Sequence, residues 1–441
     1  MRDYLVALIV FGTLPFVLTR PHLGVLLWTW LGIMNPHRLG WGFANDLPFA
    51  AIAGGVTLLS FMISKEPKRI PWVPTTIFLV LFILWMNVTT VFALVPDPAM
   101  LQWAKVMKIQ LMILLTMMLM YDRARLHHLA WVIVISLGFY GVKGGIFTLL
   151  NGGQYMVLGP EGSFISGNTE ISLALTMVLP LMRYLQATSE NKWIRRGLVA
   201  AMLLTALAII GSYSRGAFLA GGAMGLFLLL KSRKKGALAA VLVLAVPLML
   251  ATMPDKYLGK MSTIETYEQD GSAMGRINAW HFAVNLANHR PVIGGGFDPF
   301  TPELFRVYAP NPLDFHAAHS IYFSVLADHG YVGLALFLGI MFSAWRAGNR
   351  VIRQSKGRQD LLWAWELASM TQASLVGFAV GGAFLGLAYF DVFYLLVAIL
   401  VLTEAAVGKI LLLEAGVRRP GWRRIGAAAL AGVARRSGGG A

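Results

Sequence analysis

The sequence predicts an all-α protein, a polytopic membrane bundle of helices interrupted by one large polar insertion. Hydrophobic residues make up 57% of the 441 residues and charged residues only 13%, which is the composition of an integral membrane protein. Apolar runs of about 18 or more residues recur along the chain, and each is long enough to cross the hydrocarbon as a helix. The exception is the stretch from Met253 to Ala318, which is too polar to cross.

Eleven spans are clear, and the first 34 residues leave one choice open. Two shorter apolar runs, Tyr4 to Leu18 and Leu23 to Met34, are separated there by a polar tetrapeptide. We expect one interrupted crossing, which gives about 12 transmembrane helices with both chain ends in the cytoplasm. Two short crossings, 13 in all with an external N-terminus, are the alternative. The clear spans lie near residues 47–63, 74–95, 103–121, 128–150, 169–187, 197–212, 216–230, 237–252, 320–345, 365–388 and 390–413.

The residue types limit the available chemistry. The chain contains no cysteine, which excludes a disulfide framework, a thiolate nucleophile and a thiolate metal site. His316 and His319 are three residues apart, but no carboxylate at a suitable spacing accompanies them, so we expect no metal and no cofactor. The N-terminus lacks the pattern of a cleavable signal peptide, and the first apolar stretch is expected to remain as an anchor.

Basic residues predict the orientation, because Lys and Arg in short loops stay on the cytoplasmic side. Six basic clusters, separated by even numbers of crossings, hold 25 of the 37 Lys and Arg residues. The net charge of +16 therefore indicates topology and contact with anionic membrane lipids, and it does not indicate nucleic-acid binding. The clusters are residues 65–69, Arg123 with Arg125, the loops 183–196, 231–235 and 346–358, and the tail from Lys409.

This orientation divides the chain into four parts. Residues 1–252 are the N-terminal transmembrane helices, and residues 253–318 are a periplasmic loop domain with amphipathic helices. Residues 319–414 are the C-terminal transmembrane helices. Residues 415–441 form a basic cytoplasmic tail, expected to lie on the membrane surface or to be disordered.

Few cations are expected on the outer face, so those that occur there are candidates for a functional role. Arg215 lies in GSYSRGAFLA, at the outer junction of two spans. Its guanidinium group has the geometry to bind a phosphate, and Ser212, Ser214 and Gly216 permit close backbone approach. An arginine that extends toward lipid headgroups is the structural alternative.

Arg276 lies in the insertion, where residues from about Ser272 predict an amphipathic helix against the outer ends of the bundle. A solvated arginine in the first helical turn is the alternative role. The glycines at 294–296 precede no convincing helix, so a nucleotide-binding loop is not expected. The expected apolar face contains Ile277, Trp280, Val284 and Ala287, and Pro291 ends the helix.

His319 and Ser320 stand in HAAHSIYF, at the mouth of a span. An imidazole there can orient or deprotonate an acceptor hydroxyl, since histidine titrates near neutral pH. Helix capping and contact with headgroups are the alternative roles of His319. Asp328 and His329 lie about two to three turns deeper in the same span and are interpreted as polar packing.

Three lysines extend the outer positive charge into the membrane. Lys105 and Lys108 share one face of a helix, and Lys143 lies in the outer half of the next helix. An intramembrane lysine is costly and usually faces a polar cavity or partner. Because no equal set of intramembrane acids is present, these lysines together with Arg215 and Arg276 predict an outer-leaflet site for an anion.

Four segments in order resemble the O-antigen ligase and polymerase superfamily: GPEGSFISGNTEISLAL, SYSRGAFLA, GRINAWHFAVNLANHRPVIGGGFDPF and HSIYFSVLADHGYVGL. The N-terminal MNPHRLGWGFANDLPFA is similar to the branch of O-glycosylation ligases associated with exosortase systems. The resemblance covers nearly the whole chain. It implies that Arg215 and Arg276 are the family's two essential arginines and His319 its essential histidine. The family usually has asparagine where this chain has Ser320, and Asn168 matches a family asparagine or caps its helix.

Members of that superfamily transfer a glycan from undecaprenyl diphosphate to an acceptor at the periplasmic face of the bacterial inner membrane. The acceptor is commonly the lipid A core of lipopolysaccharide. The resemblance therefore implies an O-antigen ligase, a metal-independent and inverting glycosyltransferase in which His319 is the base or the acceptor anchor. The diphosphate would be bound by Arg215, Arg276, Lys105, Lys108 and Lys143, whose charge stabilises the leaving group.

Three alternatives are compatible with the same motifs. An O-antigen polymerase and a protein O-glycosylation ligase would use the same donor with a different acceptor. A transporter of lipid-linked glycans is the alternative that is not an enzyme. Transporters often contain internal inverted repeats, and the sequence shows no convincing repeat.

Overall fold

The computed structural model describes residues 1–231 and 271–416 of the chain. Within these residues every regular element is helical, which confirms the predicted all-α membrane bundle. Seven of the described helices are long and apolar enough to cross a membrane. The expected span at 237–252, the first part of the insertion (253–270) and the tail after Gly416 lie outside the described residues.

Each clear span that falls within the described residues corresponds to one helix. The insertion adds two more helices, α12 and α13, and two short 3-10 helices follow α2. The α-helices are α1 (Arg2–Thr19), α2 (Pro21–Met34), α3 (Phe49–Ile63), α4 (Pro74–Val91), α5 (Pro96–Leu119), α6 (Arg123–Leu150), α7 (Asn168–Thr188), α8 (Lys192–Gly211), α9 (Arg215–Lys231), α12 (Gly271–His289), α13 (Pro302–Tyr308), α14 (Ile321–Gln354), α15 (Leu362–Gly381) and α16 (Asp391–Glu414).

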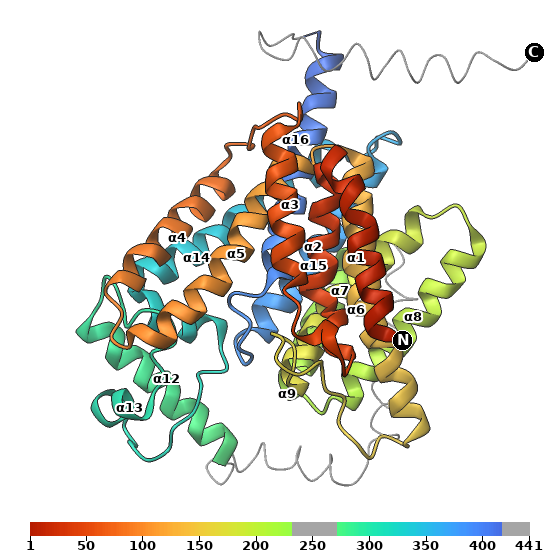
Figure 1. The fold of residues 1–441 in the computed structure, drawn as a ribbon. Helices are drawn as coiled ribbons and strands as arrows, with labels where there is room; N and C mark the ends of the chain where they lie inside the picture. The colour runs from red at the N-terminus through yellow and green to blue at the C-terminus, as the bar shows by residue number, and fades with distance from the viewer. Residues whose placement is uncertain (232–270, 417–441) are drawn as a thin grey trace, which may run out of the picture.

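The described basic clusters meet at one end of the bundle, which we call the basic end. Arg125 pairs with Glu66 (2.7 Å) and so links the loop before α4 to the start of α6. Arg358 pairs with Glu414 (2.6 Å) at the end of α16. The helices α12 and α13 lie at the opposite end, called here the insertion end (Figure 1). The structure therefore separates the basic loops from the insertion, as the charge distribution predicts.

The N-terminal residues form two helices where we expected one interrupted crossing. The Asp3 carboxylate, at the start of α1, accepts hydrogen bonds from the backbone N–H groups of Gly42 (3.2 Å) and Ala44 (3.3 Å), in the loop after α2. At the other end of α1, Ser60 Oγ donates to the carbonyl of Val17 (2.6 Å). The two helices are therefore antiparallel, and the N-terminus lies beside the loop that follows α2. This arrangement corrects the expectation and agrees with the alternative of two short crossings.

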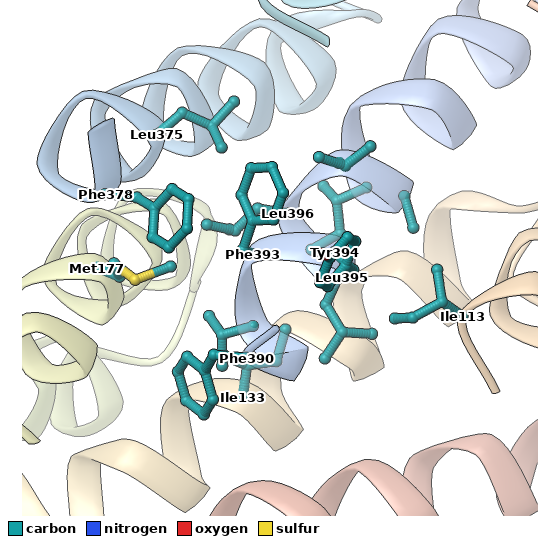
Figure 2. Close-up of a cluster of buried hydrophobic side chains, with 14 of the residues drawn as sticks. Ile113, Ile133, Met177, Leu375, Phe378, Phe390, Phe393, Tyr394, Leu395 and Leu396 are labelled. Atoms are coloured by element: carbon teal, nitrogen blue, oxygen red, sulfur yellow. The ribbon is translucent and has the colours of Figure 1, made fainter. Parts of the chain in front are cut away.

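Helix α16 forms the centre of the bundle. Its residues 391–403 are all buried, which is expected of a helix that is apolar on every side. Phe393 stacks on Phe378 of α15, with ring centroids 4.4 Å apart and planes 13° apart. Ile113, Ile133 and Met177, from three other helices, belong to the same cluster (Figure 2). The surrounding helices thus hold the turn that precedes α16 in a fixed position at the insertion end.

Helix α12 is covered on two sides, which makes its buried face differ from the predicted one. The predicted face contained Ile277, Trp280 and Val284, all of which are only half-buried. The fully buried apolar residues of α12 are Ala279, Phe282, Ala283, Leu286 and Ala287. Of the predicted face, Ala287 is fully buried and Trp280 stacks on Phe323 of α14 (5.0 Å between ring centroids). The reason is α13, whose Phe305 stacks on Phe282 (4.4 Å between ring centroids) while α14 covers the other side.

Glycines allow α6 and α8 to approach each other closely. A Cβ atom added at Gly145 would lie 2.1 Å from the carbonyl oxygen of Leu204, and one at Gly141 would lie 2.2 Å from Thr205 Oγ1. Small residues that let backbones approach are typical of packing between membrane helices. Close packing of α6 on α8 in turn positions the start of α9, which follows α8 directly.

We predict that Gly145→Ala lowers the stability of the bundle by about 1–3 kcal/mol, since the added methyl group meets backbone that cannot move aside. Gly55→Ala is the matched control, because nothing lies within 4 Å of a Cβ atom at Gly55. Thermal unfolding in detergent measures both variants. Equal unfolding midpoints for the two proteins would contradict the close helix contact.

Candidate active site

The first turn of α7 places two polar side chains at the insertion end. Asn168 Nδ2 donates a hydrogen bond to the carbonyl of Ser212 (2.9 Å) and so holds the corner between α8 and α9. Two residues later, Glu170 reaches His319, with 3.8 Å between Oε1 and Nδ1. One helical turn therefore links the corner that carries Arg215 to His319. Asn168 does not cap its own helix, because its side chain bonds across to this corner.

Arg215 is the first residue of α9, directly after a tight corner. Tyr213 has a left-handed backbone (φ 56°), which turns the chain from α8 into α9. Gly216 rests on the turn between α15 and α16, where an added Cβ atom would lie 3.3 Å from both Phe384 and Leu385. The position of Arg215 is therefore set by its contact with this turn as well as by α7.

His319 also has a left-handed backbone (φ 43°), immediately before α14. This conformation costs a residue with a Cβ atom about 1–3 kcal/mol and persists where the surroundings enforce it. On one side, Trp280 Nε1 donates to the carbonyl of Ala318 (2.8 Å). On the other, the backbone N–H of Ile321 donates to the carbonyl of Gly382 (2.7 Å). These two bonds fix the backbone on both sides of His319.

Arg276 lies on α12, one turn before Trp280. Its positive charge acts on His319, so the two side chains share one electrostatic environment. Gly275 allows α12 to approach the segment before α14 closely, since a Cβ atom there would lie 2.5 Å from Nδ1 of His316. The ring of Trp280 also lies near Phe384, with 6.3 Å between ring centroids.

The turn between α15 and α16 contacts the three segments that carry Arg215, Arg276 and His319. It contacts the corner of Arg215 through Phe384, and the same ring lies near Trp280 on the helix of Arg276. At Gly386, an added Cβ atom would lie 3.8 Å from Cα of His319. The structure thus brings together residues that are far apart in the sequence.

The surroundings of His319 favour its neutral form. Burial lowers the pKa of His319 below its ordinary value, and the charge of Arg276 lowers this pKa further, while the Glu170 carboxylate opposes both. The imidazole is therefore mostly unprotonated at neutral pH and able to accept a proton. The sequence alone did not single out Glu170, because an acidic residue in the first turn of a helix usually stabilises that helix by interacting with its dipole.

The three lysines of the predicted anion site lie in two different places. Lys105 is exposed on α5 and lies near Asp298 of the insertion, since burial raises the pKa of Asp298 and the charge of Lys105 opposes this. Lys108 is exposed one turn farther along α5. Lys143 lines a different feature, an apolar groove of about 590 Å³ formed by α6, α7 and α8. No contact that we find in the described residues joins Lys143 to His319.

Ser320 is fully buried beside His319. It is the residue before the first turn of α14, but its side chain does not cap the helix. Its hydroxyl oxygen has no hydrogen-bond partner among the described residues. A buried hydroxyl without a partner is uncommon.

Together these side chains form a site with a defined chemical capacity. Two guanidinium groups can bind an anion such as a phosphate through charge-assisted hydrogen bonds. A neutral imidazole, backed by a carboxylate, can take a proton from a hydroxyl group. The arrangement therefore suits a reaction in which an anionic group leaves and a hydroxyl group attacks.

Residues 200–338 match the protein family described as O-Antigen ligase. Residues 1–190 match a family of unknown function. A search of curated proteins finds no match. The first match contains Arg215, Arg276 and His319, and the second contains Asn168 and Glu170, so the site is built from both matched regions.

We predict that two neutralising substitutions move the pKa of His319 in opposite directions. Glu170→Gln removes the group that raises this pKa, so the pKa falls further, whereas Arg276→Gln removes a group that lowers it, so the pKa rises. NMR titration of the histidine ring signals measures both shifts, with the exposed His281 as an internal reference signal. Shifts of the same sign in both variants would contradict the observed grouping.

Proposed function

We propose that this chain, a member of the O-antigen ligase superfamily through residues 200–338, transfers a glycan from undecaprenyl diphosphate to the lipid A core of lipopolysaccharide. The reaction takes place at the periplasmic face of the inner membrane. Membership of the superfamily indicates a membrane protein that joins lipid-linked glycans, and the donor, acceptor and mechanism are our proposal. The exosortase-associated branch stays a prediction.

The observation that carries the proposal is the grouping of Arg276, His319 and Glu170 beside the corner of Arg215. The two arginines bind the diphosphate of the carrier, whose charge grows as it leaves. Fixed cations aimed at developing charge can supply several kcal/mol of transition-state stabilisation. The basic loops lie at the other end of the bundle, which supports an extracytoplasmic position for the site.

The proposed reaction is a direct displacement at the anomeric carbon. The acceptor hydroxyl attacks this carbon, the bond to the diphosphate oxygen breaks, and the electron pair leaves with the diphosphate. His319 takes the proton of the acceptor hydroxyl, and Glu170 stabilises the resulting imidazolium ion. One displacement inverts the anomeric configuration. A covalent glycosyl intermediate requires a carboxylate nucleophile, and Glu170 is better placed to orient His319.

The other candidate functions differ in what the same site would act on. A polymerase would accept a second lipid-linked glycan, and a protein ligase would accept a hydroxyl group of a polypeptide. A transporter of lipid-linked glycans would need the anion site but no base. The neutral His319 beside a carboxylate therefore favours an enzyme over a transporter.

We predict that Arg215→Gln and Arg276→Gln each lower glycan transfer by about 100-fold or more, since each removes a cation that stabilises the leaving group. Arg306→Gln is the matched control, because Arg306 is an exposed arginine on α13 of the same insertion. Reconstitution with undecaprenyl diphosphate glycan and lipid A core measures transfer as product mass. The wild-type rate should be unchanged in EDTA.

Three results would contradict the proposal. One is equal transfer by the Arg276→Gln and Arg306→Gln proteins, and another is a strict need for a divalent ion. The third is movement of the donor lipid across the membrane without any transfer, which would favour the transporter. Transfer to a second lipid-linked glycan or to a polypeptide, but not to lipid A core, would assign the acceptor to one of the alternatives.

A further inference from the structure

Helix α14 is broken in its first half, and the insertion fills the break. Gly330 has non-helical backbone angles (φ 68°, ψ −170°) within an otherwise continuous helix. The break exposes backbone groups that need partners, because unsatisfied polar groups are costly at membrane depth. The N–H groups of Gly295 and Gly296 donate to the carbonyls of Ala327 (2.8 Å) and Asp328 (2.9 Å). In return, the N–H of Tyr331 donates to the carbonyl of Pro291 (2.9 Å).

Glycine is required at this contact. A Cβ atom at Gly294 would lie 2.6 Å from the backbone nitrogen of Gly330, and one at Gly330 would lie 2.6 Å from the carbonyl oxygen of Val292. Both glycines also have positive φ angles. Gly294 therefore serves close docking of the insertion into the broken helix, while Gly295 and Gly296 supply the N–H donors.

Beside the break lies a fully buried polar network. The Tyr389 hydroxyl lies 2.5 Å from Asp328 Oδ2 and 2.9 Å from His329 Nε2. The other ring nitrogen of His329 lies 2.7 Å from the hydroxyl of Thr89, on α4. Phe297 of the insertion covers the network, with its ring centroid 4.7 Å from that of His329. We call the docked turn 291–296, the break and these four polar residues the latch.

The network links its members through one series of hydrogen bonds. The Tyr389 hydroxyl donates to Asp328 Oδ2, and its oxygen accepts from Nε2–H of His329. Nδ1 of His329 pairs in turn with the Thr89 hydroxyl. Buried polar groups that lacked such partners would be costly. The latch therefore depends on directional hydrogen bonds between α4, α14, the turn 291–296 and the turn before α16.

The latch and the candidate site lie at opposite ends of one helix pair. Helix α12 packs on the first half of α14, with Phe282, Leu286 and Ala327 buried between them. Arg276 lies near the start of α12, and the latch follows its end. His319 precedes α14, and the latch lies about two to three turns into it. A slip of one turn between these helices would displace Arg276 from His319 by about 5.4 Å.

We propose that Asp328, His329 and Tyr389 are positioning residues that fix the register between α12 and α14 and thereby hold Arg276 at His319. Tyr389 also fixes the turn before α16, which supports Arg215 and His319. The significance of this register for turnover rests on the proposed function. The register itself does not, so distance and activity can be measured separately.

The first experiment measures the register directly. Spin labels on cysteines at Met274, exposed near the start of α12, and at Leu149, exposed at the end of α6, report the position of α12. The natural chain has no cysteine, so no other residue is labelled. Pulsed EPR should give one narrow distance distribution in the parent protein and a shifted or broadened one in Tyr389→Phe. Tyr140→Phe is the control, because it removes an equally buried hydroxyl that, among the described residues, donates only to the carbonyl of Met34 of α2 (2.5 Å).

The second experiment measures turnover and binding in the same proteins. Tyr389→Phe should lower kcat by about tenfold or more and raise KM for the donor, since a displaced Arg276 would neither bind the diphosphate well nor stabilise its departure. Asp328→Asn should keep the register and most of the activity, because the amide oxygen can also accept from the Tyr389 hydroxyl. Asp328→Leu should lose both.

The outcomes separate the two proposals. Unchanged distances in Tyr389→Phe and Asp328→Leu, or equal loss of kcat in Tyr389→Phe and Tyr140→Phe, would overturn the positioning role. Broadened distances in Tyr389→Phe with unchanged kcat would overturn it as well. If the parent protein transfers no glycan, the proposed function fails, while the distance distributions still decide whether the latch sets the register.

Discussion

The arrangement of the candidate site depends on the turn between α15 and α16, residues 382–390. This turn is held on one side by α16, whose first thirteen residues are all buried. On its other side it contacts the corner of Arg215, the backbone of His319 and the ring of Trp280 on α12. Three segments far apart in the sequence therefore share one rigid support, and the apolar core determines where the charged groups stand.

The electrostatics of the site follow from this packing. Glu170 lies 3.8 Å from His319, and the charge of Arg276 acts on the same ring. A guanidinium group next to a neutral imidazole favours binding of an anionic group in contact with a hydroxyl group. The left-handed backbone of His319 fits the same interpretation, since strained residues cluster at functional sites.

Apolar periodicity and charge predicted the helices and their relative orientation, because crossing a membrane requires long apolar runs and places basic loops on one side. The same signals identified Arg215, Arg276 and His319 as exceptions. They could not reveal Glu170, whose role depends on a contact between α7 and the segment before α14. The predicted face of α12 is only half-buried at Ile277 and Val284, because α13 covers a second side of the helix, whereas Trp280 stacks on Phe323 of α14. The break at Gly330 was also missed, since its partners come from another part of the chain.

The most direct test of the central claim is a cryo-electron microscopy structure with undecaprenyl diphosphate bound. The account predicts that the diphosphate lies between the guanidinium groups of Arg215 and Arg276, with the end that carries the sugar facing His319. A diphosphate bound elsewhere, for example in the groove beside Lys143, would contradict it.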